Sequence, residues 1–182
     1  MDNILILLFC ILVLIILFFM IILLVGKNKI NEIIVPLDTS KEQINEFLIH
    51  KYKLYKEMIK FIKNNLSIKD DAFHEFLEFN SRECLQSDLI NILDKTTHEL
   101  NEYVGKYDEL LKNKDFLDLK KQLYNIQVKL EATIDYYNNK IILYNDLKAN
   151  GPTSFSTKFF EFEEYNNISN EKKEISRLIS LN

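Results

Sequence analysis

Residues 4–25 read ILILLFCILVLIILFFMIILLV, an unbroken run of 22 apolar side chains. At about 1.5 Å of rise per residue the run makes a helix roughly 33 Å long, enough to cross a bilayer core of about 30 Å. It holds no Asp, Glu, Lys, Arg or His, the residues from which ion paths and proton relays are built. We therefore expect residues 1–26 to form a transmembrane anchor whose partner, through residues 4–25, is the lipid bilayer.

The residues that flank the run predict an uncleaved anchor and its orientation. No Lys or Arg precedes the run and no Ala-x-Ala pattern follows it, so the marks of a cleaved signal are missing. Asp2 lies before the run, whereas Lys27 and Lys29 follow it, and positive flanking residues stay in the cytoplasm. This favours a single-pass protein of the cell membrane, with its N-terminus outside and its C-terminal part in the cytoplasm.

Composition narrows the classes of ligand. The net charge is −4, and nucleic-acid binding needs a basic face, so we expect no nucleic acid as partner. The three glycines, Gly26, Gly105 and Gly151, cannot form a G-x-G-x-x-G or Walker phosphate loop. Cys10 and Cys84 form no disulfide framework. We expect no cofactor and infer no small-molecule substrate.

The next segments predict a linker and two helices. A linker covers residues 27–39 and contains Pro36, and Thr39 and Ser40 begin a capping box for a helix from residue 40. The apolar stripe of that first helix is Ile44, Leu48, Tyr52, Tyr55, Ile59, Ile62 and Leu66. A second helix is capped by Ser67 and Asp70 and ends at Gly105 as the C′ residue. Its stripe runs through Phe73, Phe76, Leu77, Cys84, Leu85, Leu89, Ile92, Thr96, Leu100 and Tyr103.

A third helix has the cleanest pattern. Asn113 or Asp115 opens it, residues 149–152 end it, and a Phe-rich stretch follows. Its stripe is Phe116, Leu119, Leu123, Ile126, Leu130, Ile134, Tyr137, Ile141 and Tyr144. Long helices joined by short turns pack antiparallel. We therefore predict an all-α protein in which an up-down, four-helix-bundle type of domain over residues 40–165 follows the transmembrane helix. Residues 166–182 form a short C-terminal helix or tail from about Asn170.

The turn and third helix carry a family resemblance. Tyr107, Glu109, Leu110, Asn113, Phe116, Leu119 and Leu123 resemble the Y-x-E-L-x-x-N-x-x-F-x-x-L-x-x-x-L signature of the LemA family. Tyr136, Tyr137, Asn138, Ile141, Tyr144 and Asn145 are similar to its Y-Y-N-x-x-V-x-x-Y-N motif. The chain departs from the family at Asp108, Gln127 and Ile134, where Pro, Glu and Arg are usual. The resemblance implies a single-pass membrane protein with a cytoplasmic antiparallel four-helix bundle, and it implies no activity.

The two Tyr-Asn pairs are the sharpest feature of the third helix. Tyr137 and Asn138 recur as Tyr144 and Asn145 seven residues later, on one helix face about 10.5 Å apart. They could form a polar binding strip for a peptide or partner helix. The structural alternative, which we favour, buries both tyrosines and uses the asparagines for hydrogen bonds across helices that fix the register.

Three His-carboxylate pairs are the candidates for metal chemistry: Glu46/His50, Asp71/His74 and Asp94/His98. Di-iron bundles use Glu-x-x-His on two helices. His50 and His98 fall beside their apolar stripes, so we expect them to face solvent as surface charge pairs. Cys84 is expected as a small buried hydrophobe, because no basic neighbour lowers its pKa.

The Phe-rich stretch carries the acids Glu161, Glu163 and Glu164. These acids form either a docking edge or solvated residues beside aromatic rings that cover one end of the bundle.

No residue is assigned as catalytic, cofactor-binding or metal-binding. We predict a non-enzymatic, membrane-anchored scaffolding or protein-interaction module at the cytoplasmic face of a bacterial membrane. The alternative hypothesis is an enzyme, either metal-dependent and di-iron-like or hydrolytic, built in the bundle core. A third hypothesis is an assembly factor that acts by forming oligomers.

Overall fold

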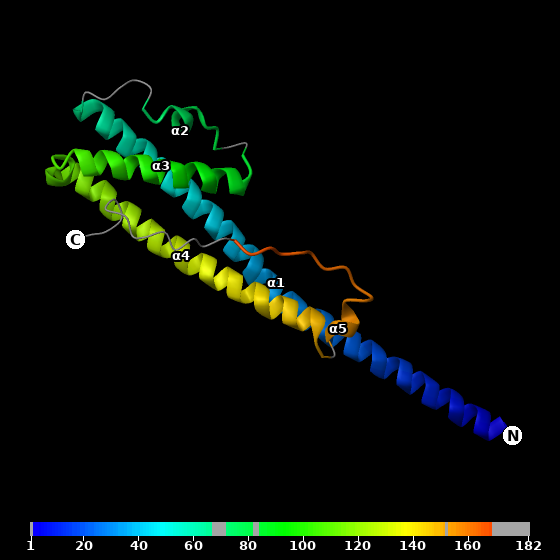
Figure 1. The fold of residues 1–182 in the computed structure, drawn as a ribbon. Coiled ribbons are helices and arrows are strands. Elements are labelled where there is room, and N and C mark those ends of the chain that lie inside the picture. Colours follow the sequence, from blue (N-terminus) through cyan, green and yellow to red (C-terminus); the bar gives the residue numbers. More distant parts are fainter. Residues whose placement is uncertain (1, 67–71, 82–83, 152, 169–182) are drawn as a thin grey trace. The chain divides into compact units, whose positions relative to one another are not determined.

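The structure is a computed structural model that describes residues 2–66, 72–81, 84–151 and 153–168. Its elements are α1 (Asp2–Asn65), α2 (His74–Glu78), α3 (Gln86–Lys106), the 3-10 turn η1 (Leu110–Lys112), α4 (Lys114–Ala149) and α5 (Thr153–Ser156) (Figure 1). No strand occurs in these ranges, so the all-α prediction is confirmed. The chain divides into two compact units, and α1 and α4 contribute to both. The first unit joins Met1–Ser40 to Tyr136–Ile168, and the second includes Lys41–Asp135.

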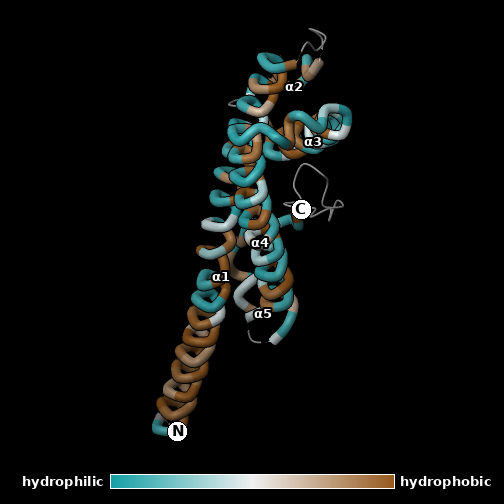
Figure 2. Tube along the Cα trace, turned by 90° about the vertical axis from the view of Figure 1, so that its left-hand side faces the viewer, coloured by the Kyte–Doolittle hydropathy of each residue, from teal (hydrophilic) through white to brown (hydrophobic). Residues whose placement is uncertain are grey.

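The first part of α1 is apolar on every side. Figure 2 shows hydrophobic residues around the whole circumference of the N-terminal end of the helix. The most apolar window of this helix has none of its residues buried in the protein. Within the described residues this is the one helix that is long and apolar enough to cross a membrane.

The expected linker at residues 27–39 is wrong, because α1 continues through it and through Pro36. The expected capping box is wrong too. The hydroxyls of Thr39 and Ser40 donate to the carbonyl oxygens of Val35 and Pro36, four residues back, at 2.9 and 2.7 Å. A proline inside a helix removes one backbone hydrogen bond. Leu37 and Ser40 are buried, and this packing keeps α1 helical despite the missing hydrogen bond at Pro36.

The predicted second helix is interrupted. It appears as the short helix α2 and the long helix α3, with non-helical residues between them, so the continuous stripe is wrong. Tertiary contacts account for the break: the ring of Phe76 lies 4.7 Å from that of Tyr52, whose hydroxyl donates to the carbonyl oxygen of Phe79 at 3.0 Å. Gly105 lies inside α3 rather than at C′. The predicted caps Ser67 and Asp70 are outside the described residues.

The second unit has its core between α1, α2 and α3. Tyr55 is fully buried, and its hydroxyl lies 2.6 Å from Oγ1 of Thr97. Thr97 gives its own proton to the carbonyl oxygen of Leu93 at 2.7 Å, so Tyr55 is the donor in the first bond. Lys95 on α3 pairs with Glu75 on α2. Near the end of α1, the ring of Phe61 lies 5.6 Å from that of Phe116 at the start of α4. The two helices are therefore antiparallel in this unit.

Helix α4 follows its prediction closely. Asn113 is its N-cap, since its Oδ1 accepts hydrogen bonds from the backbone N–H groups of Asp115 and Phe116 at 2.9 and 3.4 Å. The predicted stripe is buried except for Leu119, which is half-buried. The helix ends at Ala149, and Gly151 adopts a φ of 67° that favours glycine. The predicted C-terminal helix from Asn170 lies outside the described residues.

Candidate functional site

The candidate site lies in the first unit, where residues 153–168 return along α1 and α4. Tyr165 is buried, and its hydroxyl donates to Oδ1 of Asp38 at 2.8 Å. The ring of Tyr144 meets that of Tyr165 edge-on, with centroids 5.2 Å apart. The hydroxyl of Tyr144 donates to the carbonyl oxygen of Glu163 at 2.6 Å. Burial and the neighbouring Asp38 carboxylate raise the pKa of Tyr165 above its ordinary value. The phenols therefore stay neutral and hold the extended segment to both helices.

The Tyr-Asn pairs take part in the same attachment. Tyr137 and Tyr144 are buried, as the structural alternative predicts. The side chain of Asn138 donates from Nδ2 to the carbonyl oxygen of Ile168 at 2.8 Å and accepts from its N–H at 3.0 Å. Asn138 thus bonds an extended backbone rather than another helix, which corrects the predicted contact. Asn145 is exposed, so the two asparagines are not equivalent.

The turn after α4 is attached to the last turn of the apolar run. Oγ of Ser156 donates to the carbonyl oxygen of Leu23 at 3.0 Å. A Cβ on Gly26 would lie 2.1 Å from that Oγ and 3.3 Å from Cα of Thr153. The close approach therefore requires glycine at position 26. A glycine at the end of an apolar run is the signal from which this contact could have been inferred.

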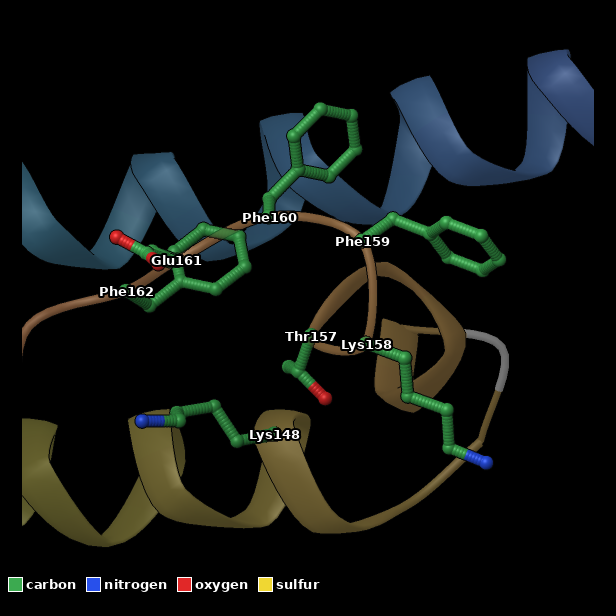
Figure 3. A pocket seen from close by; sticks show the side chains of 7 residues that line it. All are labelled: Lys148, Thr157, Lys158, Phe159, Phe160, Glu161 and Phe162. Atoms are coloured by element: carbon green, nitrogen blue, oxygen red, sulfur yellow. The ribbon is translucent and has the colours of Figure 1, made fainter.

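Beyond this turn lies a hollow of about 540 Å³, lined by Lys148, Thr157, Lys158, Phe159, Phe160, Glu161 and Phe162. Figure 3 shows Phe160 beside α1 and Lys148 on α4 across the hollow. Nζ of Lys27 lies 4.6 Å from the centre of the Phe160 ring. The side chain of Phe159 is 66% exposed, so the aromatic rings cover the end of the unit only in part. Glu161, Glu163 and Glu164 are exposed, which agrees both with solvated acids and with a docking edge.

The three histidines belong to the second unit. His50 and His98 are exposed, as predicted, and His74 lies 3.1 Å from Glu78 in an exposed pair. Its expected partner Asp71 is outside the described residues. In the ranges that the structure describes, no three His, Cys, Asp or Glu side chains gather where one cation could bind them.

Cys84 is half-buried in a bend before α3 rather than in a helical stripe, so its predicted placement is wrong. The break between α2 and α3 removes it from the helix. Burial raises the pKa of Tyr52, which lies near Cys84, and Cys84 itself adds a smaller increase.

What the site can do follows from its groups. It offers aromatic rings, lysine ammonium groups and exposed carboxylates at one end of the unit, a combination suited to binding a surface. The Asp38–Tyr165 bond was not predicted, because the two residues are 127 positions apart and no periodic pattern links them.

Comparison with known proteins places the chain in a family. No curated protein and no solved structure gave a match. The model of the LemA family matches residues 40–179, which is most of the chain and includes both motifs, the first of which begins at Tyr107 before α4. The protein belongs to the LemA family.

Proposed function

We propose that the protein is a non-enzymatic helical module that is anchored in the bacterial cell membrane and binds other proteins at the cytoplasmic face. The observation that carries this proposal is the exposure of the apolar stretch of α1 on all sides. Leaving that many apolar side chains in water costs on the order of tens of kcal/mol. A bilayer removes that cost, and the run has the length to cross it.

Extraction of membranes tests the anchor. The full-length protein should stay in the membrane pellet through high salt and alkaline carbonate. Deletion of residues 4–25 should release it, because it removes the apolar side chains that the bilayer shields from water. Ile142→Arg, on an exposed position of α4, is the matched control and should remain in the pellet. Full-length protein recovered in the salt-washed supernatant would overturn the anchor.

Cysteine labelling tests the orientation. In a background that carries Cys10→Ser and Cys84→Ser, Asn3→Cys and Glu164→Cys each supply one exposed thiol. Because Lys27 and Lys29 follow the apolar run, an impermeant maleimide should label Asn3→Cys on intact cells. Glu164→Cys should be labelled only after the membrane is permeabilised. The reverse pattern would refute the cytoplasmic placement.

The partner surface that we propose is the outward face of α4 in the first unit. Ile142 and Leu143 are adjacent, apolar and 63% and 50% exposed, which is a large apolar exposure for one turn of helix. A photo-crosslinking residue at Leu143 should give protein adducts in intact membranes. The same residue at Asp146, which is exposed and polar, should give none. Equal adducts at both positions would contradict this surface, and adducts only with a second copy of the chain would favour the oligomerising factor.

A further inference from the structure

The tip of the first unit has features of a second membrane contact. The tip comprises residues 147–151 and 153–160, which include the end of α4 and the whole of α5. Phe155 and Phe159 present exposed rings there, with exposed fractions of 47% and 66%. Lys148 and Lys158 lie in the same stretch, which contains no acidic residue. Nζ of Lys158 lies 5.7 Å from the centre of the Phe155 ring. Aromatic rings with lysines beside them are typical of segments that lie in the bilayer interface.

The depth of the tip is set by its contact with α1. Ser156 donates to the carbonyl oxygen of Leu23, and Gly26 admits the close approach of Thr153. Nineteen residue steps separate Ile4 from Leu23, or about 29 Å of helix, which nearly equals the thickness of a bilayer core. When Ile4 lies at the far edge of the core, Leu23 therefore lies at the near edge. The tip is then held at the level of the headgroups.

We propose that the tip inserts the rings of Phe155 and Phe159 into the headgroup region of the same bilayer that holds α1, while Lys158 faces the lipid phosphates. The inference rests on the proposed anchor. The occupant is a lipid surface rather than a protein partner because the tip contacts α1 at Leu23 and Gly26, where the apolar run ends and where Leu24 and Val25 are exposed. The charge of Lys158 is opposite to that of lipid phosphates.

The chain contains no tryptophan, so a single introduced Trp reports on one position. Phe155→Trp and Phe159→Trp place it at the tip, and Phe18→Trp places it in the anchor. Tyr136→Trp is the matched control. Tyr136 is 46% exposed, against 47% for Phe155, and it too has a lysine over its ring, with Nζ of Lys140 at 5.3 Å. Along α4, thirteen steps or about 20 Å separate Tyr136 from the end of the helix, which places the control away from the lipid.

The experiment uses the full-length chain in phospholipid vesicles that contain bromine-labelled acyl chains. Phe155→Trp and Phe159→Trp should show blue-shifted emission and quenching by the bromine, as Phe18→Trp should, whereas Tyr136→Trp should keep the emission of a Trp in water. Lys158→Glu should weaken the quenching at position 155 in vesicles rich in anionic phospholipid.

Each other outcome has a defined meaning. Quenching at position 18 without quenching at positions 155 and 159 overturns the tip contact and leaves the anchor standing. No quenching at position 18 overturns the anchor, and the tip contact with it. Equal quenching at positions 136 and 155 overturns the tip as the specific contact. Bromine quenching that is absent at 155 and 159, together with blue-shifted emission that appears only when a second protein is added, assigns the rings to a protein partner.

Discussion

Replacing Asn138 by alanine should loosen the extended segment that ends the first unit. Asn138 is half-buried on α4 and makes two hydrogen bonds to the backbone of Ile168. Both disappear in Asn138→Ala, and no other residue is moved. Asn145→Ala is the natural control, because Asn145 has the same residue type one heptad later on the same helix and is exposed.

The magnitude follows from the bonds and from helix propensity. Each hydrogen bond contributes about 0.5–1.5 kcal/mol, so the two together contribute about 1–3 kcal/mol. Alanine favours the helix over asparagine by roughly 0.5 kcal/mol, and that gain is common to both variants. Asn145→Ala should therefore raise the free energy of unfolding slightly. The difference between the two variants isolates the contribution of the Asn138 side chain.

Hydrogen exchange followed by mass spectrometry on the full-length chain in detergent micelles measures this difference. The amide of Ile168, whose N–H donates to Asn138, should exchange faster in Asn138→Ala than in Asn145→Ala, by about 5- to 150-fold for a loss of about 1–3 kcal/mol. Peptides from the second unit should be unchanged in both variants. Equal exchange of the Ile168 amide in the two variants would refute the attachment through Asn138.

Three further predictions concern other contacts. Burial raises the pKa values of Tyr144 and Tyr165 above the ordinary 10.0. The stability that these neutral phenols contribute is therefore full below pH 10 and is lost as the pH rises above it. Tyrosinate absorbance and circular dichroism, both recorded against pH, measure this loss. Asn113→Ala removes the N-cap of α4 and should lower the free energy of unfolding by about 1 kcal/mol in urea titration. Gly26→Ala should release α5, and hydrogen exchange of residues 153–160 should become faster, because the new Cβ would lie 2.1 Å from Oγ of Ser156.

Controls sharpen these three predictions. Tyr165→Phe should flatten the alkaline loss of stability, and an unchanged pH profile would contradict the role of its phenol. Asn113→Asp should keep the cap, since an aspartate oxygen accepts the same bonds. Ser156→Ala added to Gly26→Ala removes the closest clash, and the double variant should therefore recover part of the lost protection. Unchanged exchange of residues 153–160 in Gly26→Ala alone would refute the close approach.

Helical periodicity predicts α4 well because this helix buries one continuous face. Phe116, Leu123 and Tyr144 are buried as their spacing requires, and Asn113 caps the helix as its residue type suggests. The same reasoning fails at Pro36, where a breaker in the sequence lies inside a helix. It fails again at Phe79, where a helical stripe is interrupted. In both places, packing against other segments outweighs a local preference of only a few kcal/mol.

Part of the candidate site could be read in the sequence and part could not. The aromatic residues after residue 152 and the repeated Tyr-Asn pairs are visible as composition and spacing. Their roles differ, because Asn138 lies beside the returning backbone and Asn145 does not. The spacing of seven is identical for both, so only the path of residues 161–168 separates them.

The sequence alone determined the apolar run of residues 4–25, the all-α class and the family, because each depends on residue types in a local order. The tertiary structure alone decided that α1 continues past Pro36, that Asp38 meets Tyr165 and that Ser156 meets Leu23. These contacts join residues more than a hundred positions apart. Local propensity acts over a few residues, whereas such contacts form only after the chain has folded back on itself.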